Sequence, residues 1–204
     1  TLLSIASEGL FLLAGVLSPC YPMPVIQTRE VAMRIESTRS EWIRSALFVD
    51  FDNIHIGLEE EYGKNIARIF GCDSAQWVEW VERQAVVLGQ DGKARPRKLL
   101  IRRCYMNPES FPGYRRRFTQ AAFEVIDCPP LTEKGKTSTD MHLVMDVLDA
   151  LADPVHLDEF IIMSGDADFT PLLLRLRRHD RLTAIFSARR ASAAYKASSD
   201  RIIA

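Results

Sequence analysis

Two short apolar runs in this chain end at closely spaced carboxylates. The first run ends at Asp50 and Asp52, and the second ends at Asp166 and Asp168. Such runs are typical of buried parallel strands, and the carboxyl ends of parallel strands carry the site in open α/β sheets. Carboxylates gathered at one edge repel one another unless a cation neutralises them. The pattern therefore predicts a site for a hard divalent metal that acts on phosphates.

Strand-like and helix-like stretches alternate along the chain after residue 46. We expect strands over 47–51, 98–105, 123–127, 160–163 and 183–186. We expect helices over 54–70 with a break near Gly63, and over 75–88, 114–123, 137–151, 171–178 and 192–203. This alternation predicts an α/β fold, a three-layer α/β/α sandwich around a mostly parallel sheet, in one domain over residues 41–204.

Composition narrows the class of protein. The 204 residues are 47% hydrophobic and 26% charged, as in soluble globular proteins. The net charge of −1 provides no global positive field, so any nucleic-acid binding relies on local patches. The four cysteines include no CxxC pair, which favours reduced thiols and a cytoplasmic location.

The first 40 residues differ from the rest and are expected to form an extension that is non-native or loosely packed. Residues 2–17 are largely apolar but include Glu8, and they are shorter than the ~20 apolar residues that a membrane helix needs. A signal peptide is the alternative interpretation of this stretch. We therefore expect no membrane association.

A further carboxylate, Asp140, opens the helix predicted over residues 137–151. Thr137 and Asp140 have the spacing of a capping box in a looser, aspartate form. Asp140, Val144, Val147 and Leu151 share one face at helical spacing, so Asp140 is expected at the amino end of the core-facing stripe. A carboxylate in that position needs a partner or a metal. Asp146 lies about 120° away around the helix and is expected to be solvated or to support the site.

Each of these features has a simpler alternative. Residues 50–53 could form an ordinary turn, and Asp168 could cap the helix that follows. Lys134 and Lys136 could contact phosphate or lie in a solvated loop. The same choice, between a nucleic-acid contact and a solvated face, applies to the basic clusters 95–98, 102–103, 115–117 and 175–178.

Taken together, these motifs resemble the NYN domain, the LabA-like branch of the PIN-like nuclease superfamily. The resemblance rests on Phe48-Val49-Asp50-Phe51-Asp52-Asn53, on the lysine-glycine stretch before Asp140, and on Ser164-Gly165-Asp166-Ala167-Asp168-Phe169. It extends from about residue 47 to residue 203. Lys134-Gly135 precedes Asp140 by a longer stretch than is usual in the family, which leaves the role of Lys134 open.

The resemblance implies a PIN-like fold and metal-dependent hydrolysis of RNA. It implies that Mg²⁺ or Mn²⁺ is held by four aspartates, Asp50, Asp140, Asp166 and Asp168. Asn53 would brace Asp50 through a hydrogen bond. Secondary candidates for the site are Asp52, Asp146, Lys134 and Lys136.

Two rival functions stay open at this stage. A haloacid-dehalogenase-type phosphatase would use Asp50-Phe51-Asp52 as its nucleophile motif, although that family also has a cap insertion. An RNA-binding or regulatory domain would have the same acidic residues but would not cleave RNA. RNA is the expected partner both for a ribonuclease and for an RNA-binding domain. The sequence leaves open whether the protein forms homo-oligomers.

Overall fold

The computed structural model describes residues 42–84, 87–88, 94–130, 138–188 and 191–203. The expected extension over residues 1–40 and both Lys134 and Lys136 fall outside these ranges. Within the described residues, no helix is both long and apolar enough to cross a membrane.

The centre of the fold is a six-stranded sheet in the order β5-β4-β1-β6-β7-β8, with every neighbouring pair parallel. The strands are β1 (Ile43–Asp50), β4 (Arg97–Met106), β5 (Glu124–Asp127), β6 (Glu159–Met163), β7 (Leu182–Phe186) and β8 (Arg201–Ile203). A separate antiparallel pair joins β2 (Val87–Leu88) to β3 (Ala94–Arg95). The expected mostly parallel sheet is therefore confirmed, and each of the five predicted strands lies in it.

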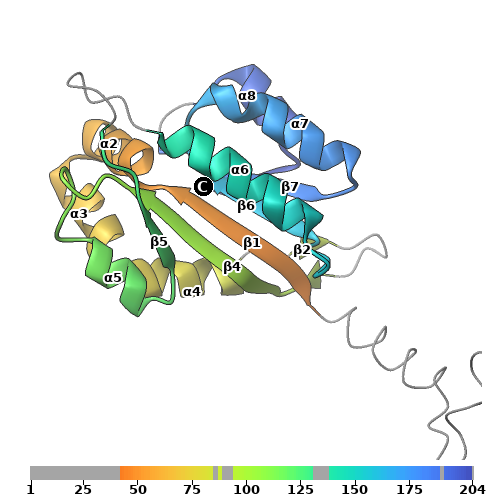
Figure 1. The fold of residues 1–204 in the computed structure, drawn as a ribbon, viewed down its shortest axis with the longest axis horizontal. Helices are drawn as coiled ribbons and strands as arrows, with labels where there is room; N and C mark the ends of the chain where they lie inside the picture. The colour runs from red at the N-terminus through yellow and green to blue at the C-terminus, as the bar shows by residue number, and fades with distance from the viewer. Residues whose placement is uncertain (1–41, 85–86, 89–93, 131–137, 189–190, 204) are drawn as a thin grey trace, which may run out of the picture. The chain divides into compact units, whose positions relative to one another are not determined.

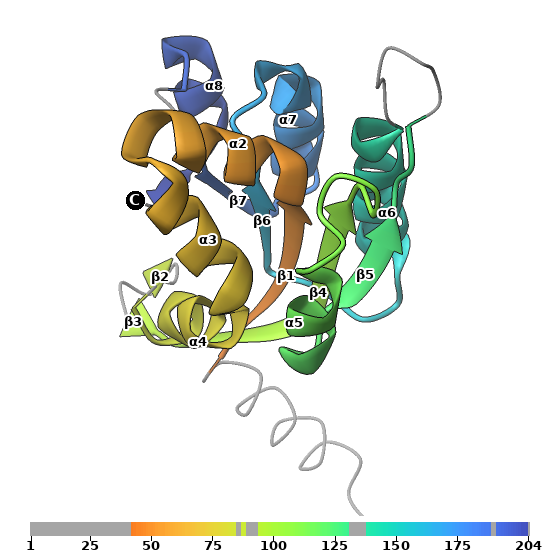
Figure 2. The same cartoon turned by 90° about the vertical axis from the view of Figure 1, so that its left-hand side faces the viewer.

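Helices cover both faces of this sheet (Figures 1 and 2). One layer contains α2 (Phe51–Tyr62), α3 (Lys64–Cys72), α4 (Ser74–Gln84) and α5 (Arg115–Gln120). The other contains α6 (Thr139–Ala152), α7 (Thr170–Arg178) and α8 (Ala193–Ser198), with the 3-10 turn η1 (Ala167–Phe169) leading into α7. The three-layer α/β/α architecture is confirmed.

Alternation along β1 explains why the core has two halves. Leu47 and Val49 face a cluster built with α2 to α5, whereas Ala46 and Phe48 face a cluster built with α6, α7 and α8. Successive side chains of a strand point to opposite faces, so Asp50 lies on the same face as Phe48. This parity directs the first carboxylate of the site toward α6 and α8.

Three helices end earlier than predicted. The helix predicted over 192–203 ends at Ser198, because Asp200 accepts hydrogen bonds from both the backbone N–H and the hydroxyl of Thr183, and the chain continues as β8. The helix predicted over 114–123 ends at Gln120, and Ala122 adopts a left-handed φ of 59° before β5. The helix predicted to reach Leu88 ends at Gln84, and Leu88 pairs in β2.

Candidate acidic site at the carboxyl edge of the sheet

Parallel pairing brings the two acidic motifs to one edge of the sheet. β1 ends at Asp50, β6 ends at Met163, and the two strands are neighbours with Val49 opposite Met163. The charge of Asp140, in the first turn of α6, acts on Asp50. Figure 1 shows the amino end of α6 near the arrowhead of β1. The structure therefore gathers Asp50, Asp140, Asp166 and Asp168 from three separate segments.

Asp50 is the buried member of this group, with only 4% of its surface exposed. Its Oδ1 accepts a hydrogen bond from the backbone N–H of Asn53 at 3.3 Å, which caps the start of α2. Its Oδ2 accepts a hydrogen bond from the hydroxyl of Ser164 at 3.1 Å. The pKa of Asp50 is raised to about 7, chiefly because the carboxyl is buried. The two hydrogen bonds lower the pKa, and the nearby charges of Asp140 and Asp52 add to the rise.

Ser164 connects the two motifs directly. Its hydroxyl donates to Asp50 and also accepts a hydrogen bond from the backbone N–H of Asp166 at 3.3 Å. The side chain is fully buried, so no water competes for these bonds. Ser164 is not among the site residues that the sequence predicts, although a serine directly after an apolar strand is a signal for one.

Asn53 is hydrogen-bonded to Asp50 as expected, but through its backbone and not through its side chain. Its side-chain Oδ1 instead accepts a hydrogen bond from the N–H of Gly165 at 2.8 Å. Asn53 therefore ties the turn after β6 to the start of α2. A Cβ at Gly165 would come within 2.8 Å of Ser187 Oγ and 3.4 Å of Asn53 Oδ1, so the turn packs closely on both.

Asp166 caps the turn that follows β6. Its Oδ1 accepts a hydrogen bond from the backbone N–H of Asp168 at 2.9 Å. The alternative that Asp168 caps the following helix is wrong, because α7 begins after Phe169 without a side-chain cap. Asp168 is exposed and Asp166 is partly buried, so both carboxylates remain accessible at the rim.

Asp140 lies at the margin of α6 and not on its core-facing stripe. The buried residues of α6 are Thr139, Leu143, Val147 and Ala150, and Asp140 is exposed. The expected stripe differs from the observed one by one residue at three of its four positions, and Val147 belongs to both. The helix begins at Thr139 with Ser138 at its N-cap position. Thr137, the other member of the expected capping box, lies outside the described residues. Partial desolvation, and then the charges of Asp166 and Asp168, raise the pKa of Asp140.

The two secondary aspartates have other partners. Asp52 accepts a hydrogen bond from the backbone N–H of Asn107 at 3.2 Å and so holds the loop after β4. Asp146 accepts a 2.6 Å hydrogen bond from the hydroxyl of Tyr105 and pairs with Arg103 at 3.2 Å. Asp146 therefore braces α6 against β4, which makes the solvated alternative wrong.

Several arginines of the basic clusters are neutralised within the described residues. Arg97 is buried and pairs with the fully buried Glu159 through two hydrogen bonds of 2.5 and 2.7 Å. Other pairs are Arg102–Glu82, Arg103–Glu124, Arg115–Asp127 and Arg177–Asp200. Arg97 in particular is inaccessible to nucleic acid.

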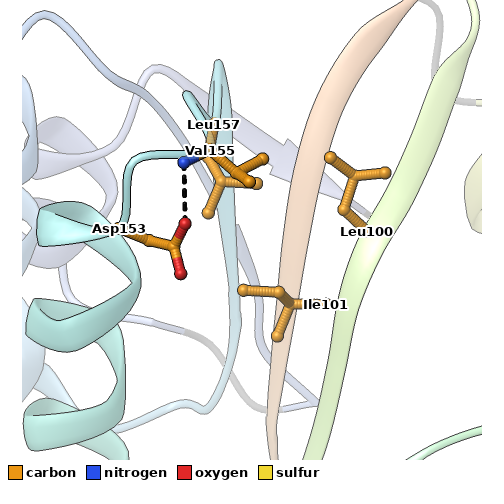
Figure 3. A pocket seen from close by; sticks show the side chains of 5 residues that line it. All are labelled: Leu100, Ile101, Asp153, Val155 and Leu157. Carbon is orange, nitrogen blue, oxygen red and sulfur yellow. Dashed lines mark hydrogen bonds between the residues drawn. The ribbon is translucent and has the colours of Figure 1, made fainter. Parts of the chain in front are cut away.

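A cavity of about 320 Å³ lies at the opposite end of α6 from Asp140 (Figure 3). Its lining is mostly apolar and consists of Leu100, Ile101, Asp153, Val155 and Leu157. The one carboxylate there, Asp153, already accepts a 2.7 Å hydrogen bond from the N–H of Val155. None of the described residues that line the cavity has a positively charged side chain that would bind a phosphate.

The acidic edge has suitable chemistry for a divalent cation but does not form a closed cage. Carboxylate oxygens are the ligands that Mg²⁺ and Mn²⁺ prefer, and neighbouring carboxylates help to raise the pKa of Asp50 and of Asp140. Across the described ranges, however, no three His, Cys, Asp or Glu side chains converge closely enough to hold a metal ion in this conformation. The donor set fits the ion, and the exposed carboxylates of Asp140 and Asp168 would have to close on it.

Comparison with known proteins identifies the class to which this fold and site belong. The family model of the NYN domain matches residues 44–204, and the chain belongs to that family. The NYN domain is part of the PIN-like nuclease superfamily, which supports a nuclease-type function and nucleic acid as the partner. The family match gives no support to the haloacid-dehalogenase alternative, for which Asp50 would also be a poorly accessible nucleophile.

A solved structure has a similar fold. It is that of VPA0982, a protein of unknown function from Vibrio parahaemolyticus, with a TM-score of 0.60 and 19% sequence identity. The alignment covers 80% of this chain and 93% of that chain. Among curated proteins, none matches the sequence.

Proposed function

We propose that this protein is a metal-dependent ribonuclease that hydrolyses phosphodiester bonds at the acidic edge of its sheet. The observation that carries the proposal is the gathering of Asp50, Asp140, Asp166 and Asp168, whose charges act on one another at the carboxyl ends of β1 and β6. Such a cluster is costly without a cation and favourable with one.

The four aspartates would hold Mg²⁺ or Mn²⁺. When bound, the ion would lower the pKa of a water molecule for in-line attack and stabilise the leaving oxygen. Hydrogen bonds within the chain orient the carboxylates. Ser164 and the Asn53 backbone each donate to one oxygen of Asp50, and the backbone N–H of Asp166 donates to the Ser164 hydroxyl. No side-chain nucleophile is required.

Substitution of Asp166 by Asn tests this proposal. The amide keeps an oxygen that can accept the Asp168 N–H, so the turn is expected to survive while the anionic ligand is lost. Mn²⁺-dependent cleavage of labelled RNA should fall by at least about 100-fold. The circular dichroism spectrum should be unchanged.

The matched control is Asp153→Asn, at the opposite end of α6, where the amide oxygen can likewise keep the bond to the Val155 N–H. This control should cleave like the wild type. Undiminished cleavage by Asp166→Asn would refute the assignment.

A catalytically idle RNA-binding domain is the second candidate. It is favoured by one observation, that the described side chains do not converge into a metal cluster in this conformation. The two candidates separate when single-stranded and structured RNAs are incubated with Mg²⁺, Mn²⁺ or chelator. Binding that survives chelation, without cleavage in either metal, supports the idle domain.

A further inference from the structure

Tyr195 reaches the acidic site from the last helix of the chain. Its side chain is fully buried and belongs to the cluster between the sheet and helices α6, α7 and α8. The phenol hydroxyl donates a hydrogen bond to the backbone carbonyl of Ser164 at 3.2 Å. Ser164 is the residue whose own hydroxyl joins Asp50 to Asp166. Tyr195 of α8 therefore contacts the backbone of Ser164, the residue whose side chain is hydrogen-bonded to both Asp50 and Asp166.

The helix that carries Tyr195 is held at both ends. At its start, Ser192 Oγ accepts a hydrogen bond from the Tyr195 N–H at 3.2 Å. Just past its end, Asp200 bonds to Thr183 in β7 through its side chain and its backbone N–H. A short helix fixed in this way can set the position of a neighbouring turn, because neither end is free to shift.

The surroundings of Tyr195 favour the protonated phenol, which can donate a hydrogen bond. Burial, and then the charges of Asp166 and Asp50, raise the pKa of Tyr195 well above its ordinary value. Both carboxylates are close enough for their charges to act on the phenol. Among the described hydrogen bonds, that of the Tyr195 hydroxyl goes to the Ser164 carbonyl. Tyr195 is thus placed to act on the site through the backbone of Ser164.

We propose that Tyr195 is a positioning residue of the acidic site, which holds the turn after β6 so that Ser164 and Asp166 face Asp50 in the geometry that binds the metal. This inference rests on the proposed metal-dependent nuclease function. It assigns Tyr195 no contact with the metal or with RNA. Loss of the hydroxyl should therefore weaken metal binding and turnover while leaving the affinity for RNA unchanged.

The test compares Tyr195→Phe with Ser74→Ala. Ser74 is a matched control because its buried hydroxyl also donates to a backbone carbonyl at 3.2 Å, that of Arg117, on the opposite face of the sheet. Both variants should lower the melting temperature of the metal-free protein by about 2–4 °C. Only Tyr195→Phe should raise the Mn²⁺ dissociation constant, by about 5-fold, as measured by calorimetry without RNA. Its kcat should fall by a similar factor, with KM for RNA within about twofold of the wild type.

The outcomes separate the two proposals. If the wild type binds no Mn²⁺ and cleaves no RNA, the proposed function fails and the role of Tyr195 fails with it. If the wild type binds and cleaves while Tyr195→Phe matches Ser74→Ala in Mn²⁺ affinity, only the positioning role is overturned. Should Tyr195→Phe fail to fold, Ser192→Ala, which loosens the first turn of α8, takes its place with the same expectation and the same overturning result.

Discussion

Ser164 donates its hydroxyl to Oδ2 of Asp50 at 3.1 Å, across the boundary between the carboxyl ends of β6 and β1. The two residues are 114 positions apart in the chain. The bond links one acidic motif to the other, and it stabilises the charged form of a carboxylate that burial otherwise keeps protonated. The protonation state of Asp50 therefore depends on its hydrogen bond with the neutral side chain of Ser164.

Replacement of Ser164 by Ala should raise the pKa of Asp50 above its value of about 7, because the charged carboxylate loses a hydrogen-bond donor. The expected rise is about 0.5–1 pH unit, from the ~1 kcal/mol of one such bond. An NMR titration of carboxyl-labelled protein without metal measures it. An Asp50 titration that is unchanged, or shifted to lower pH, would contradict the role of this bond.

Asp50→Asn should stabilise the metal-free protein at high pH. The carboxyl has a raised pKa in the folded state, near 7 against 3.8 unfolded, so the folded state binds the proton more tightly. The free energy of unfolding of the wild type therefore falls as pH rises from about 4 to about 7, and this loss is complete above pH 7. At pH 8 in chelator the variant should be more stable by on the order of 2–4 kcal/mol.

Urea denaturation at pH 8 and at pH 4 checks this prediction. The advantage of Asp50→Asn should vanish at the lower pH, where Asp50 is neutral in the folded wild type. A variant that is less stable than the wild type at pH 8 would contradict the prediction. It would mean that the charged carboxylate of Asp50 is stabilised by more than its hydrogen bonds to Ser164 and Asn53.

Gly165→Ala should displace the turn that presents Asp166. The new Cβ would lie 2.8 Å from Ser187 Oγ, so the serine side chain or the turn must move. The expected cost is about 1–3 kcal/mol in the free energy of unfolding. The double variant Gly165→Ala, Ser187→Ala removes the obstructing oxygen and should recover most of this loss relative to Ser187→Ala alone. Equal losses in both backgrounds would mean that the contact with Ser187 is not the cause.

Arg97→Ala should be among the most destabilising substitutions far from the acidic edge. It leaves Glu159, which is fully buried, with only the hydroxyl of Ser45 as a donor among the described contacts. Loss of one partner of a buried ion pair costs about 3–5 kcal/mol. Arg83→Ala, which breaks the exposed pair with Glu79, should change stability by less than about 1 kcal/mol. Chemical denaturation of both variants tests the contrast.

Much of this structure could be predicted from local patterns. The apolar runs along β1 and β6 indicated buried parallel strands, because both faces of such strands contact helices. The break at Gly63 between α2 and α3 was visible as a glycine within a helical pattern, and Gly63 indeed has a φ of 87°. The edge where the acidic motifs meet followed from the rule that parallel strands end on the same side.

Other features depended on contacts between distant segments. The helical phase of α6 was placed one residue out, because apolar spacing alone did not distinguish the stripe through Leu143 from the one through Val144. The end of α8 was overestimated because Asp200 bonds to Thr183 in β7, which no local pattern reveals. The basic run around Arg97 looked like a solvated or RNA-binding face, yet Glu159 draws Arg97 into the interior.

By itself, the sequence determined the α/β class, the NYN family and the edge of the sheet at which the candidate aspartates lie. All three depend on local hydrophobic periodicity and on motifs a few residues long. Only the tertiary structure decided which polar groups hold those aspartates. Ser164, the side chain of Asn53 and the hydroxyl of Tyr195 acquire their partners across the sheet and from the last helix. A hydrogen bond requires two groups within about 3 Å in a suitable orientation, and that condition is met only when the chain has folded.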